Sequence, residues 1–412
     1  MLQPIVEVST GKLIAAEALA RFPEGSPSPQ ATFEHAHAAG WGADLEAACL
    51  RRALGRRHDM PDGVMLSVNL SPDALAAPGV RDALDCDLTG LIVEVTEPPL
   101  MDPEVLNALL ADFRRRGALI AVDDLSIGYA GLLRLTTLRP DIVKLDRSLV
   151  TAVRDNPAKV AVIRAVSGLA RWIDARLVAE GVETLDDLSA LAELDVDYVQ
   201  GWVIAPPDTD LPQASPQSVA ACRIARQGLL EKASSPRRGL GPDVSAVTAA
   251  LASSSQLADL QGVLASAASE LGFDVIGLST LTSDDHLHEI VAFGNPVDPT
   301  RYALDDFPAT RAAMATGVML EAHIEDQHTD HAERALLTDL HLASVLIVPL
   351  SGEGAPLGIL EFSHRTTCRW TSRQLEQARI LADHLAPALL RMSQDRVVNV
   401  RQQAAERSAY AV

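Results

Sequence analysis

Eight short aliphatic runs occur in the first 200 residues or so of the chain, and most of them end in a polar or charged residue. The runs are residues 4–8, 13–18, 65–69, 91–95, 119–123, 142–145, 177–179 and 198–200. Longer segments between them, such as residues 104–116 and 158–173, place apolar residues at helical spacing. Alternating strands and helices predict a parallel sheet with helical crossovers, and eight such units favour a closed barrel. The first two runs are too close together for a helix, so we expect an irregular (β/α)8 TIM-like barrel with one antiparallel strand.

The remainder of the chain follows other patterns. We expect the barrel to occupy residues 1–210. Pro, Gly and Ser residues then bracket one helix-like segment, residues 219–232, which predicts a helical linker and hinge over residues 211–244. Residues 245–395 contain strand-like runs between amphipathic helices, which is typical of an α+β domain whose antiparallel sheet is covered on one face. Residues 396–412 are polar and Ala-rich, and we interpret them as a C-terminal tail.

Charge and cysteine content exclude several functional classes. The formal net charge is −20 and the pI is about 4.9, which argues against broad binding to DNA or to an anionic membrane. The four cysteines show no C-x-x-C spacing, so a zinc ribbon or a disulfide framework is not expected. No apolar run approaches the ~20 residues that span a bilayer. These features predict a cytoplasmic protein.

Acidic and amide residues stand at the ends of the predicted barrel strands. They are Glu17, Asn69, Glu94, Asp123, Asp124 and Glu180. The carboxyl ends of barrel strands converge on the face that holds the active site. Several carboxylates in one mouth repel one another unless they are paired, and clusters of oxygen ligands suit Mg²⁺ or Mn²⁺.

The adjacent aspartates Asp123 and Asp124 indicate a centre for two ions, because one carboxylate can bridge two ions while its neighbour binds one. Such a centre suits hydrolysis of a phosphodiester. Lys144, one strand later, could neutralise a phosphate or orient a water. The alternative is structural, since acidic residues at strand ends often cap the following helix. Each residue alone fits that role better, but six in register on successive strands favour the metal site.

The motifs around these residues resemble those of EAL domains, the phosphodiesterases that linearise cyclic dimeric GMP. The signature segment is Glu17-Ala18-Leu19-Ala20-Arg21, and the resemblance extends over residues 2–207. The other matching segments are Gln3-Pro4-Ile5-Val6, Val68-Asn69-Leu70-Ser71-Pro72, Glu94-Val95-Thr96-Glu97, Asp123-Asp124, Pro140-Asp141 with Lys144-Leu145-Asp146-Arg147, Ala179-Glu180-Gly181-Val182-Glu183 and Gln200-Gly201.

The resemblance implies roles for individual residues. It assigns the first metal to Glu17, Asn69, Glu94 and Asp123, and the second to Asp123, Asp124 and Glu180. It implies catalytic roles for Glu180, Lys144 and Asp124, with Glu180 as the base for the attacking water and Lys144 beside the attacked phosphate. It implies that Gln3, Arg21 and Gln200 contact the nucleotide, that Glu97 holds a loop, and that Glu183 supports the site from behind. The implied cofactors are two Mg²⁺ or Mn²⁺ ions.

One segment departs from the family pattern. The family loop after the paired aspartates usually reads Phe-Gly-Thr/Ala-Gly-Tyr-Ser-Ser-Leu, whereas residues 125–131 include Ser126 and Ile127. Serine lacks the backbone freedom of the glycine that it replaces. Two hypotheses follow: a phosphodiesterase that converts cyclic di-GMP to linear pGpG, or a weak or inactive receptor that binds the nucleotide without cutting it.

Residues 245–392 resemble GAF sensory domains, mainly in residues 315–317, 343–350 and 358–362. The resemblance implies that this domain regulates the barrel, through an unidentified small ligand or through a homodimer. Most of the eleven histidines lie in this half of the chain, and their scattered positions favour surface or capping roles over a haem or metal site. The expected partners are therefore cyclic di-GMP, a second copy of the chain and a small GAF ligand.

Overall fold

The computed structural model describes residues 1–95, 103–123, 135, 138–234, 245–254, 256–294, 301–352 and 355–409, with the backbone alone for residues 393–409. Contacts divide the chain into two compact units, Met1–Gln227 and Gly228–Val412, and each is described by itself. Helix α10 (Pro216–Ser234) runs across this division and contains the helix predicted over residues 219–232. Within the described residues, no helix has the length and apolar character needed to cross a bilayer.

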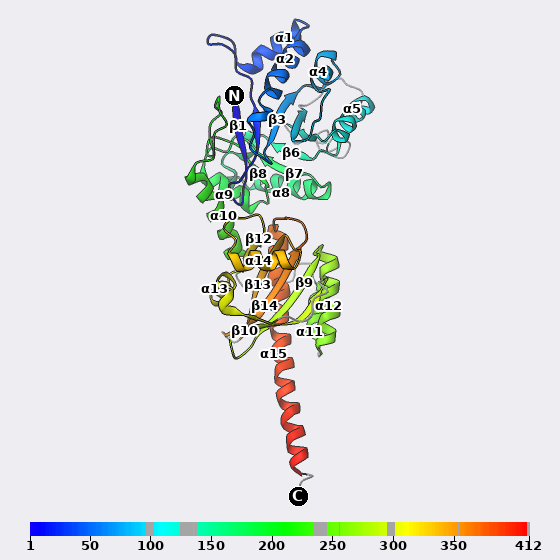
Figure 1. Ribbon diagram of the computed structural model, residues 1–412, viewed down its shortest axis with the longest axis vertical. Helices are drawn as coiled ribbons and strands as arrows, with labels where there is room; N and C mark the ends of the chain where they lie inside the picture. The colour runs from blue at the N-terminus through cyan, green and yellow to red at the C-terminus, as the bar shows by residue number, and fades with distance from the viewer. Residues whose placement is uncertain are drawn as a thin grey trace. The chain divides into compact units, whose positions relative to one another are not determined.

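The strands of the first unit form a closed barrel in chain order, as predicted (Figure 1). They are β1 (Leu2–Glu7), β2 (Leu13–Ala18), β3 (Met65–Leu70), β4 (Leu91–Val95), β5 (Leu119–Val122), β6 (Ile142–Leu145), β7 (Arg176–Ala179) and β8 (Tyr198–Val199). Strand β1 pairs antiparallel with both β2 and β8, and the other neighbouring strands are parallel. The predicted irregular barrel with one antiparallel strand is therefore confirmed.

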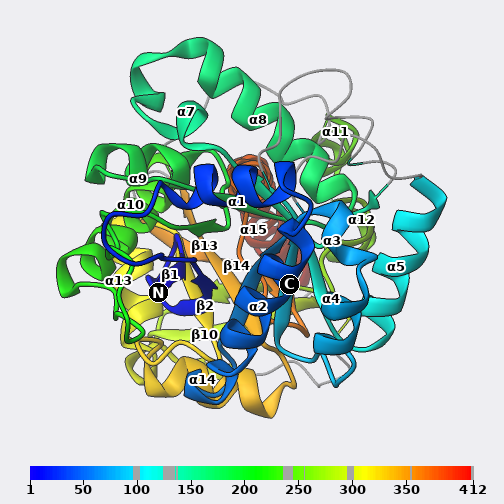
Figure 2. The same cartoon turned by 90° about the horizontal axis from the view of Figure 1, so that it is seen from above.

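The helices of this unit lie outside the barrel strands (Figures 1 and 2). Besides α10 they are α1 (Pro29–Ala38), α2 (Gly42–Leu54), α3 (Pro72–Leu75), α4 (Pro78–Ala83), α5 (Pro103–Arg115), α7 (Arg147–Val150), α8 (Pro157–Trp172) and α9 (Leu185–Glu193). Several begin with a capping side chain followed by proline, as at Asn156-Pro157, where the Asn156 side chain accepts from the first free amides. Such caps separate strand from crossover helix along the sequence.

Successive side chains of a barrel strand point alternately toward the outer helices and into the barrel. A polar residue in an aliphatic run can therefore lie on the inner face. In β4, Leu91, Val93 and Val95 belong to the main core with the outer helices, whereas Ile92 belongs to a small cluster inside the barrel. Because successive side chains point to opposite faces, Glu94 shares the inner face with Ile92. The interior cluster consists of Ile5, Ala15, Ile92, Ala121, Ile142 and Val178.

The second unit contains a six-stranded sheet in the order β11-β10-β9-β14-β13-β12, with antiparallel pairing throughout. Its elements are α11 (Ser245–Ser253), α12 (Leu257–Leu271), β9 (Val275–Leu281), β10 (His286–Phe293), β11 (Arg301–Ala303), α13 (Pro308–Thr316), β12 (Leu320–His323), α14 (His331–Asp339), β13 (Ser344–Gly352), β14 (Ala355–His364) and α15 (Ser372–Ala409). The predicted antiparallel α+β fold is confirmed. Residues 396–409, predicted as a tail, continue the helix α15.

Helices cover both faces of this sheet, so the expectation of a single covered face was wrong. One face packs in a core with α11, α12 and α15. The other face packs with Met314 of α13 and Leu337 of α14. Helix α14 buries only Glu333 and Leu337. Its sequence therefore carries little of the apolar periodicity by which a packed helix is recognised.

Glu361 of β14 is partly buried in the second unit, on the sheet face that α13 and α14 cover, and Gly277 lies opposite it on β9. Burial, together with the nearby Glu333 and Glu289, raises the pKa of Glu361 to about 8. The folded state therefore retains a proton that the unfolded chain releases near pH 4.5. Because the folded state binds more protons, its stability falls as the pH rises from about 4.5 to about 8.

We expect Glu361→Gln to remove the part of this pH dependence that Glu361 contributes, because the amide mimics the protonated acid. Hydrogen-exchange protection of β14, corrected for intrinsic rates, should fall at least ~10-fold in the wild type from pH 5 to pH 8, the equivalent of one pKa unit. It should fall less in the variant, where Glu333, whose pKa burial raises to about 7, still releases a proton over this range. Asp306→Asn, at an exposed position, is the matched control and should behave as the wild type. Equal slopes in wild type and Glu361→Gln would contradict the prediction.

Candidate metal centre and active site

Polar side chains from seven barrel strands or strand ends meet at one end of the barrel. Glu17 and Asn69 are each the last residue but one of their strands. Asp123, Glu180 and Gln200 directly follow the last residues of theirs. Strand register brings neighbours together, since Asn69 lies opposite Glu94 on the next strand. Strand β1 runs in the opposite direction, so its beginning lies at this end, and Gln3 lies opposite Glu17.

The Glu17 carboxylate accepts hydrogen bonds from two side-chain amides that are far apart in the sequence. The Asn69 Nδ2 atom donates to Glu17 Oε1 at 2.6 Å, and Gln200 Nε2 donates to Glu17 Oε2 at 2.6 Å. Gln200 Nε2 also lies 3.1 Å from Gln3 Oε1, and Gln3 donates to the carbonyl of Ala205 at 3.3 Å. Gln3 and Gln200 are buried, with 8% and 4% of their surface exposed. In this structure these two glutamines therefore orient a carboxylate.

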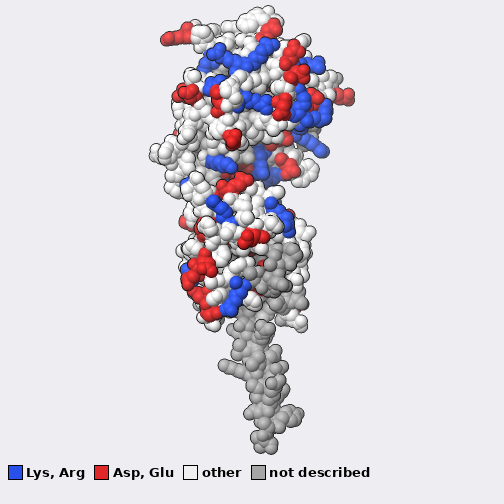
Figure 3. Space-filling model, viewed as in Figure 1, with Lys and Arg blue, Asp and Glu red and all other residues white. Residues whose placement is uncertain are grey.

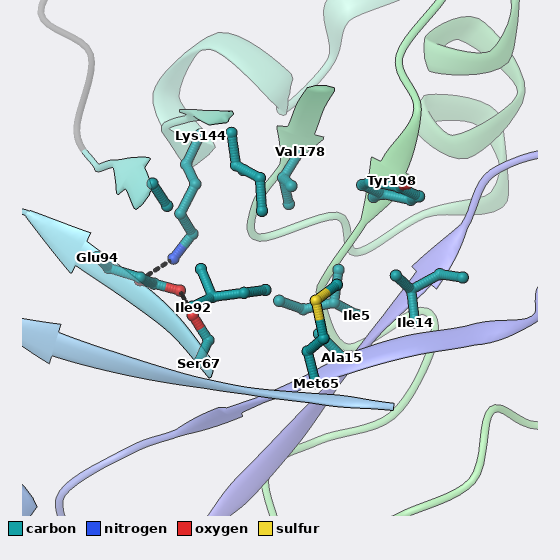
Figure 4. A pocket seen from close by; sticks show the side chains of 12 residues that line it. Ile5, Ile14, Ala15, Met65, Ser67, Ile92, Glu94, Lys144, Val178 and Tyr198 are labelled. Carbon is teal, nitrogen blue, oxygen red and sulfur yellow. Dashed lines mark hydrogen bonds and ion pairs between the residues drawn. The ribbon is translucent and has the colours of Figure 1, made fainter. Parts of the chain in front are cut away.

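Lys144 lies at the centre of the carboxylate cluster, where only 2% of its side chain is exposed. Its Nζ atom is 2.5 Å from Glu94 Oε2 and also forms an ion pair with Glu180. The Nζ atom is 3.6 Å from Glu17 Oε2 and 3.8 Å from Asp123 Oδ1. Figure 4 shows the ammonium group pointing at Glu94 from the neighbouring side of the barrel. One buried cation thus lies among four carboxylates.

The charges in this cluster shift one another's pKa values. Burial and the neighbouring Glu17 raise the pKa of Glu94 to about 7, although Lys144 opposes the shift. Burial also raises the pKa of Glu180 well above its usual range, again against the pull of Lys144. Burial disfavours the charged form of Lys144, but the surrounding carboxylates outweigh burial and raise its pKa. Four ionised carboxylates would carry more negative charge than one ammonium group compensates, so Glu94 and Glu180 release their protons less readily than free carboxyls.

The donor set fits a hard divalent cation. Oxygen atoms of Glu17, Glu94 and Glu180 lie within 4.8 Å of one another. The Asn69 and Asp123 side chains adjoin this triad, and both amide and carboxylate oxygens are ligands of Mg²⁺ and Mn²⁺. The buried Oε1 atom of Gln200 accepts no hydrogen bond from the described residues. A buried oxygen without a hydrogen-bond donor, next to several carboxylates, fits a site that binds a cation.

Below the cluster, the barrel interior is apolar. A small cavity there is lined by aliphatic residues, with Ser67, Glu94 and Lys144 at one end (Figure 4). Ile5, Ile92 and Val178 are among its lining side chains. An apolar floor lowers the local dielectric constant and strengthens the electrostatic interactions above it. In contrast, the outer face of the first unit seen in Figure 3 carries interspersed acidic and basic side chains.

The structure places the remaining predicted site residues as follows. Arg21 is exposed, and its guanidinium donates to the carbonyl of the preceding Ala20 at 2.7 Å. Glu183 forms an ion pair with Arg147 at 2.9 Å. Asp124 and Glu97 lie outside the described residues, as does the loop at residues 125–131 that departs from the family pattern. Their predicted roles stay predictions.

Two residues that contact the site were missed in the sequence. Ser67 is fully buried and its Oγ donates to Glu94 Oε1 at 2.5 Å. Its position two residues before Asn69, on the same strand face, was the available signal. Glu46 of α2 binds the turn after Asn69 through Ser71. A single glutamate within an alanine- and leucine-rich helix gave no such signal.

Two protein-family models match the chain. The family model described as the EAL domain matches residues 1–207, which is half of the chain. The chain belongs to the EAL domain family. A GAF domain model matches residues 257–389, so an EAL domain is followed by a GAF domain.

Curated relatives of this EAL protein match its first half. It is 31% identical over 222 residues to "Probable cyclic di-GMP phosphodiesterase PdeG" of Escherichia coli K12, covering 50% of this chain and 44% of the relative. It is 31% identical over 221 residues to "Cyclic di-GMP phosphodiesterase PA2567" of Pseudomonas aeruginosa PAO1, covering 50% of this chain and 37% of the relative. The aligned region thus spans less than half of the length of either relative.

Solved structures of EAL proteins also resemble the chain. One is the calcium and cyclic di-GMP complex of Klebsiella pneumoniae BlrP1, with 30% identity and a TM-score of 0.44, covering 50% of this chain and 54% of the other. Another is a c-di-GMP-bound standalone EAL protein of Vibrio cholerae O395, with 22% identity and a TM-score of 0.46, covering 53% and 95%.

Proposed function

We propose that the EAL domain is a metal-dependent phosphodiesterase that hydrolyses cyclic di-GMP to linear pGpG. The observation that carries the proposal is the buried group of four carboxylates around Lys144 at the end of the barrel where active sites lie. The printed names of its relatives supply the substrate, because the oxygen ligands by themselves indicate only a phosphodiester. In the reaction, the oxygen of water bonds to phosphorus, one P–O3′ bond breaks, and the leaving 3′ oxygen receives a proton.

Glu17, Asn69, Glu94 and Asp123 would hold one Mg²⁺ or Mn²⁺ ion, and Asp123, Asp124 and Glu180 a second. When bound, two such ions would clamp the attacking and leaving oxygens and make the water a better nucleophile. The amide of Asn69 would present its oxygen to the ion while its Nδ2 atom keeps Glu17 in place. Ser67 would fix the orientation of the Glu94 carboxylate, and Gln200 would fix that of Glu17.

Other residues of the chain would act on the substrate directly. Glu180 is the most exposed of the four carboxylates, with 23% of its side chain exposed, so its carboxylate can reach a water at the mouth and accept its proton. Lys144 would place its positive charge beside the phosphate as negative charge develops there. Exposed Arg21 would contact the nucleotide, whereas buried Gln3 and Gln200 would shape the floor of that site.

We further propose that the GAF domain regulates this activity. The proposed organisation is the barrel at residues 1–210, a helical linker at 211–244, the GAF domain at 245–395 and the terminal segment at 396–412. The ranges matched by the two family models fall inside the proposed domains, which supports these bounds. A homodimer and a small GAF ligand are the proposed means of regulation.

The test is turnover of cyclic di-GMP with Mn²⁺ by the full chain. We expect linear product, and a loss of at least ~10²-fold in kcat for Glu17→Gln and for Asp123→Asn, because each removes a ligand of the centre. Asp62→Asn, at an exposed position, is the matched control and should retain full activity. Tight binding of the nucleotide without turnover would support the receptor hypothesis. Absence of both binding and turnover would contradict the proposed function.

A further inference from the structure

Glu46 is a buried carboxylate outside the proposed metal centre, and both of its oxygens contact Ser71. It lies on α2 with 6% of its surface exposed. Its Oε2 atom accepts from the backbone N–H of Ser71 at 2.8 Å, and its Oε1 atom accepts from Ser71 Oγ at 2.7 Å. One carboxylate therefore fixes both the backbone and the side chain of Ser71.

Ser71 lies at the junction between the strand that carries Asn69 and the next helix. Its Oγ also accepts from the backbone N–H of Ala74 at 3.2 Å and so caps α3. Two residues earlier, Asn69 Nδ2 reaches Glu17 Oε1 at 2.6 Å. Asn69 itself is exposed, so packing alone holds its side chain weakly. The backbone anchored at Ser71 thus sets where the Asn69 amide lies.

A histidine completes the environment of Glu46. His37 Nε2 lies 2.7 Å from Glu46 Oε1. The imidazole ring packs directly against the backbone of Gly42, where a Cβ atom would overlap with it. The Glu46 carboxylate therefore contacts one residue that precedes it in the chain, His37, and one that follows it, Ser71. The contact with His37 therefore helps to fix the orientation of the Glu46 carboxylate at Ser71.

We propose that Glu46 is a positioning residue for Asn69: it holds the turn at Ser71 so that the Asn69 amide stays at the metal centre. The proposal rests on the proposed metal centre. Residues behind metal ligands typically change metal affinity ~10–100-fold when they are replaced. A glutamine at position 46 has an NH2 group in place of one carboxylate oxygen, so it cannot accept from the N–H and the Oγ of Ser71 with two separate oxygens. It also lacks the negative charge that strengthens both hydrogen bonds.

A double-mutant cycle separates positioning from general stabilisation. Mn²⁺ dissociation constants are measured for the full-length wild type, Glu46→Gln, Asn69→Ala and the double variant. We expect Glu46→Gln to weaken Mn²⁺ binding by ~10–100-fold in the wild-type background. In the Asn69→Ala background the same change should have less than about a 2-fold effect, because the residue through which Glu46 acts is gone. Glu34→Gln, an exposed change on α1, is the control and should leave the affinity unchanged.

An equal loss in both backgrounds, or no loss in the wild-type background, would overturn the proposal. A second readout needs no metal: the crystal structure of Glu46→Gln should show that the contact between Asn69 and Glu17 is lost. If that contact is retained, positioning is refuted even where Mn²⁺ binds normally. If it is lost while the wild type binds no Mn²⁺, the metal centre is refuted and the positioning role stands.

Discussion

Replacing Lys144 by methionine is expected to destabilise the first unit by about 3–5 kcal/mol when no divalent ion is present. The side chain is 2% exposed and its ammonium contacts the Glu94 and Glu180 carboxylates, with Glu17 and Asp123 within 4 Å. Without it, the carboxylates repel one another in a nearly dry site. Mn²⁺ should restore most of the lost stability, because a divalent cation replaces the missing positive charge. Turnover of cyclic di-GMP should still fall by ~10²–10³-fold, since the charge beside the phosphate is gone.

The measurement is chemical denaturation of wild type and Lys144→Met, each with EDTA and with Mn²⁺. The predicted signature is a larger gain in stability on adding Mn²⁺ in the variant than in the wild type. Lys12→Met, an exposed change, should match the wild type under both conditions. Equal Mn²⁺ effects in Lys144→Met and wild type would show that the ammonium and the ion do not compensate the same charges.

Replacing Gly201 by alanine should produce the other large effect. Gly201 follows Gln200 directly, and a Cβ atom there would overlap with the backbone oxygen and nitrogen of Val182. Those backbone atoms take part in the pairing of this segment, since Val182 N–H donates to the Gln200 carbonyl. Overpacking of this kind costs about 1–3 kcal/mol or more. The shift should also move Gln200 away from Glu17 and weaken Mn²⁺ binding.

Gly168→Ala is the matched comparison. Gly168 is exposed within α8, and a Cβ atom there meets no neighbouring atom within 4 Å. Alanine should therefore stabilise this helix by about 0.5–1 kcal/mol. Urea denaturation of both variants gives the two free energies. If Gly201→Ala is as stable as the wild type, the close approach of the two backbone segments is not a requirement of the fold.

The strands of the barrel could be predicted because each one is a compact aliphatic run ended by a polar residue. Glu17, Asn69 and Glu94 could be predicted as neighbours because parallel strands place their carboxyl ends at the same edge. The antiparallel first strand followed from the short link between the first two runs. These inferences needed only periodicity, spacing and the geometry of β/α units.

Contacts between distant side chains could not be predicted in the same way. Gln200 and Glu17 are 183 residues apart, and only closure of the barrel brings them together. The resemblance implied that Gln3 and Gln200 contact the nucleotide, whereas their burial beneath Glu17 depends on packing. The sequence signal for helix α14 is weak because its buried surface is formed by Leu337 and a glutamate rather than an apolar stripe.

The central claim is that the acidic groups at the barrel mouth jointly bind divalent ions. Crystals of the full chain soaked in Mn²⁺ and measured at the manganese edge test it most directly. The account predicts an anomalous peak among the side-chain oxygens of Glu17, Asn69, Glu94 and Asp123, and its loss in Glu94→Gln. Soaks at saturating Mn²⁺ that give no anomalous peak at this position, with the carboxylates still paired to Lys144, would contradict the central claim.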